Sequence, residues 1–106
     1  MAPPVVDPLD PASTALVVVD AQVAFASDES PLAERGVDLT GPIETVPRVA
    51  ELIDGCREAD LTIAYIRSVR RGDNRDGPER AHRILPYIYR EGEPICRAGS
   101  PDAEYV

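Results

Sequence analysis

The sequence of 106 residues contains no lysine, and all eleven of its basic residues are arginine. It also has no tryptophan, one phenylalanine, one histidine and two cysteines. Two cysteines are too few for a disulfide scaffold, and their spacing matches no zinc-binding pattern. A single histidine leaves no second imidazole at metal-ligand spacing. The sequence therefore predicts no metal site and no cofactor.

The two cysteines and the histidine are each expected to be ordinary residues. Cys56 falls within a predicted helix and Cys96 within a polar loop. Neither has a neighbouring base or helix N-terminus that would activate a thiol. His82 is expected on the solvent face of a short helix. We therefore expect no catalytic thiol at these positions.

Long apolar runs and an excess of basic residues are also lacking. No run approaches the roughly 20 residues that cross a bilayer, and the N-terminus lacks the basic segment and apolar core of a signal peptide. A cytoplasmic protein is expected. The formal net charge of −8 makes nucleic acid and anionic membranes poor partners. At this length the chain is one domain at most.

The most informative segment is an unbroken apolar run at residues 15–19, which Asp20 ends. β-Branched residues without polar alternation are typical of a strand covered on both faces, as in the middle of a parallel sheet. Ligands of open α/β sheets bind at the carboxyl ends of the strands, so Asp20 stands where chemistry usually takes place. The alternative is that Asp20 only starts a turn. The spacing alone leaves both interpretations open.

Further elements follow from the local patterns. A loop is expected over residues 21–40, with a helical turn near Pro31–Glu34. A helix is expected to begin at Thr45 as its N-cap, to carry Pro47 in its first turn and to end near residue 59 or 60. Its apolar residues recur at spacings of three and four: Val46, Val49, Ala50, Ile53 and Cys56.

The second half of the chain contains a second strand and several short segments. Residues 61–68 predict a strand parallel to the first, which places Asp20 and the pair Arg67–Ser68 at one edge of the sheet. Residues 69–77 are expected to form a solvated charged loop, the alternative being an arginine rim that meets an anionic substrate. A short helix is expected over residues 78–85, irregular structure over 86–97, and the start of another helix at Ser100–Asp102.

Two strands and one good helix cannot cover four apolar strand faces, and a two-stranded sheet is marginal by itself. We therefore expect an incomplete piece of a larger α/β domain. Completion by partner chains and partial disorder are the alternatives. Uncovered strand faces also predict self-association into a homo-oligomer.

The residues around the first strand resemble a known family. ALVVVDAQVAF is similar to the opening strand of the isochorismatase-like hydrolases, or cysteine hydrolases, in which an Asp is followed at fixed spacing by Gln and Phe. Here these residues are Asp20, Gln22 and Phe25, with Ala21 where the family more often has Met. RVAELIDGCREADLTIAYIRSVRR resembles the family's first helix and second strand, and GEPICRAGSPDAEYV the segment before its third strand.

The resemblance implies a fold and an activity. The expected fold is a Rossmann-like three-layer α/β/α sandwich with a parallel sheet, apparently truncated. Residues 14–106 would be the N-terminal part of the hydrolase domain. Residues 1–13 are expected to form an extended N-terminal arm because they are rich in proline, which lacks a backbone donor and keeps the preceding residue out of the helical region. Family members hydrolyse small molecules: amides such as nicotinamide, N-carbamoyl compounds, ureidoacrylate, or the vinyl ether of isochorismate.

The resemblance also implies site residues. The amidase members use an Asp, Lys, Cys triad, in which Asp20 would be the proton-transfer residue. Members that cleave isochorismate rely on this Asp as a general acid without requiring the Cys. Phe25 matches an aromatic position near the substrate, and Gln22 is the other candidate substrate-binding residue.

The sequence departs from the family in three ways. The Lys and Cys of the triad come from the missing half, and neither Cys56 nor Cys96 stands at the nucleophile's position. The Asp-x-His-x-His metal motif of nicotinamidase-type members has no counterpart after Ser68, which disfavours a metal-dependent nicotinamidase. We therefore expect this chain alone to have no measurable hydrolase activity.

Two other functions are considered. A non-catalytic scaffold or interaction role is the main alternative for a truncated member without Lys and Cys. A phosphoryl-transfer enzyme of the haloacid dehalogenase type is disfavoured, because Gln22 stands where that family needs a second Asp for Mg²⁺.

Overall fold

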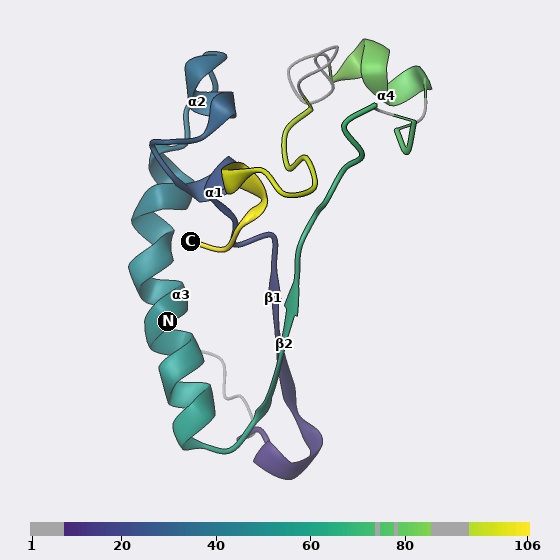
Figure 1. Cartoon of the computed structure of the whole chain (residues 1–106). Coiled ribbons are helices and arrows are strands. Elements are labelled where there is room, and N and C mark those ends of the chain that lie inside the picture. The colour runs from purple at the N-terminus through teal and green to yellow at the C-terminus, as the bar shows by residue number, and fades with distance from the viewer. Residues whose placement is uncertain (1–7, 74, 78, 86–93) are drawn as a thin grey trace, which may run out of the picture.

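The computed structural model describes residues 8–73, 75–77, 79–85 and 94–106. Figure 1 shows a long helix lying along one side of two strands, with several short helices gathered beyond the strand ends. In chain order the elements are η1 (Pro11–Ser13), β1 (Ala15–Val19), α1 (Val23–Ala26), α2 (Pro31–Glu34), α3 (Thr40–Glu58), β2 (Thr62–Ile66), α4 (Glu79–Ile84) and η2 (Pro101–Ala103). No helix in the described ranges is both long enough and apolar enough to cross a bilayer.

β1 and β2 form a parallel two-stranded sheet. Their register runs from the pair Ala15 and Thr62 to the pair Val19 and Ile66. Because α3 lies between the strands in sequence, the three elements form a βαβ unit. The predicted α/β class, both strands and their parallel pairing are confirmed.

Only one face of this sheet is covered by a described element. Leu16, Val18 and Ile63 are buried or half-buried, and Val18 lines a cleft together with residues of α3, which lies along one side of the strands in Figure 1. On the opposite face, Val19 and Ile66 are 59% and 50% exposed. The sequence therefore predicted correctly that both faces of the sheet are apolar. Within the described residues, no element covers the second face.

The start of α3 corrects the prediction. The helix begins at Thr40, five residues before the predicted N-cap Thr45, whose hydroxyl instead donates to the Gly41 carbonyl at 2.8 Å. Asp38 accounts for the earlier start, because its Oδ1 accepts a hydrogen bond from the Thr40 N–H at 2.9 Å. Hydrogen bonds from the Thr40 side chain and then from its backbone N–H lower the pKa of the Asp38 carboxyl, as expected for a carboxylate at a helix N-terminus. Pro47 consequently lies inside the helix rather than in its first turn.

The segment predicted as a loop over residues 21–40 holds two short helices. α2 occupies the predicted turn at Pro31–Glu34, and the buried Ser30 caps it by accepting from the Leu32 N–H at 3.0 Å. α1 was not predicted, because VAFA has no cap signal and is only four residues long. These helices surround the compact part of the molecule, which lies beyond the strand ends.

The buried apolar residues form two small clusters there, and Phe25 packs against both. One cluster comprises Ala24, Cys96 and Ala103, and the other Leu32, Leu39 and Ile95. By contrast, none of the residues of α3 is buried. The helix therefore rests loosely along the sheet, and the tightest packing lies where the strands end.

The remaining predictions fall on shorter segments. Residues 1–7 of the expected arm and residues 86–93 lie outside the described residues. η1 is a helical turn within the part of the arm that is described, and the Asp10 carboxylate caps it. α4 lies within the helix predicted at residues 78–85. The helix start predicted at Ser100–Asp102 is the single 3-10 turn η2.

Candidate functional site

Asp20 directly follows β1, at the carboxyl end of the sheet, as predicted. Its N–H donates to the Ile66 carbonyl at 2.9 Å, and its own carbonyl accepts from the Gln22 N–H at 2.8 Å. Between these bonds its φ angle is 56°, in the left-handed region that non-glycine residues rarely adopt. The chain therefore turns sharply at Asp20, away from the strand direction.

Asp20 contributes to an apolar cleft of about 470 Å³ between the end of β1 and the part of α3 from Pro42 to Ile53. Among the described residues that line this cleft, Asp20 has the only charged side chain. The others are Val18, Val19, Ala21, Phe25, Ala26, Pro42, Thr45, Val46, Val49, Ala50, Ile53, Tyr65, Tyr105 and Val106. The cleft thus combines one carboxylate with an apolar wall, the combination typical of small-molecule sites.

Phe25 and Gln22, the two predicted substrate-binding residues, lie differently with respect to the cleft. Phe25 is half-buried and lines it. Gln22 is fully buried, and its side-chain amide is bonded to the backbone of Ser68 and Ala103. These bonds give Gln22 a structural role, which no sequence pattern signalled because its partners are 46 and 81 residues away. Contact of either residue with substrate stays a prediction.

Cys96 was predicted in a polar loop and is instead fully buried, with a φ angle of 55°. Burial raises the pKa of its thiol to about 11, and the negative charge of Asp102 adds to the effect. Asp102 is itself buried and accepts a hydrogen bond from the Cys96 N–H at 2.7 Å. A thiol held protonated in this way is a poor nucleophile. Its environment therefore agrees with the prediction that Cys96 is not catalytic.

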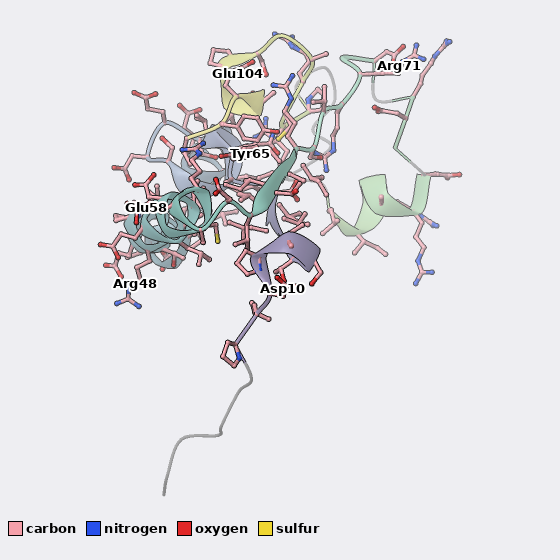
Figure 2. All side chains as sticks on the ribbon, turned by 90° about the horizontal axis from the view of Figure 1, so that it is seen from below. Asp10, Arg48, Glu58, Tyr65, Arg71 and Glu104 are labelled. Atoms are coloured by element: carbon pink, nitrogen blue, oxygen red, sulfur yellow. The ribbon has the colours of Figure 1, made fainter. Side chains whose placement is uncertain are left out.

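None of the arginines near the strand ends lines the cleft. Arg67 pairs with Glu104 at 3.4 Å, and its guanidinium lies 5.8 Å from the centre of the Tyr105 ring. Arg71 pairs with Asp73 at 2.8 Å in an exposed loop. Figure 2 shows Arg71 well apart from Tyr65 and Glu104. Arg71 thus follows the prediction of a solvated loop rather than that of a rim over the site.

Within the described residues, no three or more His, Cys, Asp or Glu side chains gather in a group that could hold a metal ion. The acidic and basic residues of α3 do not contribute to the cleft either. Arg48 and Glu58 are exposed and point away from the sheet in Figure 2. Asp20 is therefore the one charged side chain that the described residues bring to this cleft.

Comparison with known proteins identifies partial relatives, although no protein-family model matches the chain. The ureidoacrylate amidohydrolase RutB of Caulobacter vibrioides is 31% identical over 61 residues, which cover 58% of this chain and 27% of the relative. RutB of Methylobacterium radiotolerans is 35% identical over 60 residues, which cover 57% of this chain and 23% of the relative. RutB of Caulobacter segnis is 30% identical over 61 residues, which cover 58% of this chain and 26% of the relative.

These matches confirm the resemblance to the isochorismatase-like hydrolases over part of the chain. The matched segment spans about a quarter of the length of each relative. What the chain shares with them is therefore a portion of an amidohydrolase, and the rest of the relatives' sequence has no counterpart in the match.

Proposed function

We propose that residues 14–106 are the N-terminal part of an isochorismatase-like hydrolase domain, and that residues 1–13 are an N-terminal arm. The domain would hydrolyse an amide or carbamoyl bond, or a vinyl ether, in a small molecule. The observation that supports this most is the position of Asp20, which ends β1 and supplies the only charged side chain among the described residues lining an apolar cleft. The similarity to ureidoacrylate amidohydrolases supports the amide reaction in particular.

In this proposal Asp20 transfers protons. A carboxylate held beside a bound substrate can accept or give a proton as a general base or acid. Beside a cysteine nucleophile it would help to take the thiol proton, and in vinyl-ether cleavage it would give a proton to the substrate. The apolar wall and Phe25 would hold the uncharged part of the substrate and exclude water.

The remaining catalytic groups would come from outside this chain. The sequence has no lysine, and the environment of Cys96 makes it unsuitable as the nucleophile. The fold we propose for the complete domain is the Rossmann-like three-layer sandwich. The exposed face of β1 and β2 supports it, because a parallel sheet is normally covered on both sides.

A direct test compares this 106-residue chain with the product of the whole gene. Both would be assayed against ureidoacrylate, a panel of small amides and isochorismate. We expect no turnover by the chain alone and turnover by the whole product. Clear turnover by the chain alone, abolished by Asp20→Asn, would contradict the incomplete site that we propose.

A matched control is available for Asp20→Asn in the whole product. Asp60 also has a left-handed backbone, with φ of 59°, but is exposed at the end of α3 and does not line the cleft. Asp20→Asn should lower kcat/KM by about 10²- to 10⁴-fold, the usual contribution of general acid–base catalysis. Asp60→Asn should leave it unchanged. Equal effects of the two substitutions would assign the loss to folding rather than to proton transfer.

A non-catalytic scaffold or interaction role is the second candidate, and the exposed apolar sheet face favours it. Val17, Val19 and Ile66 are about half exposed on this face, an arrangement that invites association. We propose that the chain forms a homo-oligomer in solution when it stands alone. The coding sequence after Val106 separates the two functions: a Lys at a strand end and a later Cys would indicate an amidase, and a stop codon an interaction role.

A further inference from the structure

Gln22 connects three chain segments at the point where the sheet ends. Its side chain is fully buried, and its amide nitrogen donates to the carbonyl oxygens of Ser68 and Ala103, both at 2.8 Å. Its amide oxygen accepts from the Ser68 N–H, also at 2.8 Å. One side chain thus joins the residues after β1 to the residues after β2 and to η2.

The hydrogen-bonding pattern at this position requires an amide. Both N–H groups of the side chain are used, and the oxygen accepts from a backbone donor. A carboxylate of the same shape would place an acceptor oxygen, where the amide has its NH₂ donor, against two carbonyl oxygens. A methionine would fill the same space and leave the Ser68 N–H and the carbonyl oxygens of Ser68 and Ala103 without the partner that Gln22 provides.

The backbone of Gln22 acts directly on Asp20. Its N–H donates to the Asp20 carbonyl at 2.8 Å, while the Asp20 N–H is held by Ile66 on β2. Left-handed backbone is unfavourable for a residue with a side chain, so the surrounding contacts must maintain the φ angle of 56° at Asp20.

The backbone of the residues next to Gln22 is also hydrogen-bonded to the C-terminal segment. The Val23 N–H donates to the Glu104 carbonyl at 2.9 Å, and the Val106 N–H donates to the Ala21 carbonyl at 3.0 Å. The side chain of Gln22 holds this same C-terminal segment through Ala103. The turn at Asp20 is thus enclosed by β2 and the C-terminal segment, with Gln22 bonded to both.

We propose that Gln22 is a positioning residue for Asp20: it maintains the left-handed turn that directs the Asp20 side chain to the cleft, a role that we put in place of the substrate contact predicted from the sequence. This role concerns the same site as the proposed function, but it rests on the backbone geometry and not on the reaction.

The test is an NMR measurement of φ at residue 20 in the full 106-residue chain, from backbone chemical shifts and the three-bond HN–Hα coupling. Gln22→Met removes the amide at nearly constant volume. We expect φ at residue 20 to leave the positive range in this variant, and the nuclear Overhauser contacts between Asp20 and the cleft residues to be lost. A folded Gln22→Met chain with positive φ at residue 20 would overturn the proposal.

Ser30→Ala is the matched control. Ser30 is also fully buried, its hydroxyl donates to the Ala24 carbonyl, and it accepts from the Leu32 N–H. This control should lose stability, as any chain with an unpaired buried group does, and keep the positive φ at residue 20. If both variants lose the left-handed turn, the effect is general loosening and the proposal fails.

A second variant keeps the proposal testable if Gln22→Met does not fold. In Gln22→Glu a protonated carboxyl can still accept from Ser68 and donate to one carbonyl, whereas a carboxylate cannot donate. Burial against two carbonyl oxygens should raise the pKa of this glutamate above its unfolded value. The folded state then binds more protons, so stability and the left-handed turn should return as the pH falls and be lost as it rises through the raised pKa.

Neighbouring groups must be accounted for in that titration. Cys96, whose sulfur lies 3.8 Å from the Gln22 nitrogen, stays protonated over this range because burial raises its pKa to about 11. Asp20, Asp102 and Glu104 are also present in the wild-type chain. Measuring the wild type over the same pH range therefore separates their effect from that of the introduced glutamate. A turn in Gln22→Glu that is insensitive to pH contradicts the proposal. An inactive whole-gene product with an intact turn would count against the proposed function alone.

Discussion

Buried polar side chains at the end of the sheet hold both neighbouring and distant segments of the chain together. Gln22 bonds to Ser68 and Ala103, and Asp102 bonds to the N–H of Cys96 and the hydroxyl of Ser100. Buried polar groups are costly unless paired, so each of these contacts fixes its segments in one arrangement. At the residue scale, the position of Asp20 therefore depends on polar side chains that take no part in the proposed chemistry.

The buried thiol of Cys96 gives a prediction at this scale. Raising its pKa from 9.0 to about 11 lowers the thiolate population near pH 8 about a hundredfold. Iodoacetamide should therefore modify Cys96 at least about a hundredfold more slowly in the folded chain than in urea. Peptide mass spectrometry after timed alkylation measures the rate, with the half-buried Cys56 as an internal comparison.

The same shift has a consequence for stability. Because the folded state holds the thiol proton more tightly than the unfolded chain does, the contribution of Cys96 is fully present below pH 9 and is lost as the pH rises toward 11. Cys96→Ala should remove this alkaline part of the pH dependence in urea titrations. Rapid alkylation of Cys96 in the folded chain would show that the site opens readily.

At the element scale, α3 contains a proline, Pro47, that destabilises the helix. Pro47 lies inside the helix, where it has no N–H to donate to the carbonyl of Ile43 one turn earlier. Its side chain is exposed, so its removal costs little packing. Pro47→Ala should therefore stabilise the chain by about 1–3 kcal/mol, measured by urea denaturation followed by circular dichroism.

Pro42 is the matched control for Pro47. It lies in the first turn of α3, where the backbone N–H groups have no partner inside the helix. Pro42→Ala should change the free energy of unfolding by less than about 0.5 kcal/mol. An equal gain from both substitutions would mean that the benefit does not come from relieving the helix interior at residue 47.

The elements were predictable where one local pattern determines them. Both strands follow from apolar β-branched runs, and α2 from the Ser-Pro cap at Ser30. The beginning of α3 was misplaced because Thr45 resembles an N-cap, whereas Asp38 bonds to Thr40 just outside the helix. The positions of Asp20 and Phe25 at the strand end followed from the chain order, but the contacts of Gln22 and the burial of Cys96 depend on residues 94–106 folding back. No local pattern encodes such distant contacts.

At the scale of the whole molecule, the uncovered sheet face is the dominant feature. It carries Val17, Val19 and Ile66, each about half exposed, in a chain with a net charge of −8. Apolar burial favours association of such faces, and the net charge opposes it, so salt should strengthen the self-association that we propose.

Sedimentation velocity over a range of concentrations, at low and moderate salt, measures this association. Val17→Thr with Ile66→Thr should reduce it by making the exposed face polar at nearly constant shape. Val69→Thr is the control, because Val69 is similarly exposed, at 44%, but lies outside the sheet. A chain that remains monomeric at all concentrations and in salt would contradict the proposal of a homo-oligomer.

The central claim is that the Asp20 carboxylate exchanges protons with the substrate, and a comparison of kcat/KM in wild-type, Asp20→Asn and Asp60→Asn whole-gene product tests it most directly. We predict that Asp20→Asn lowers kcat/KM at least about 10²-fold with the fold retained, and that Asp60→Asn matches the wild type. A folded Asp20→Asn product with an undiminished kcat/KM would contradict the account.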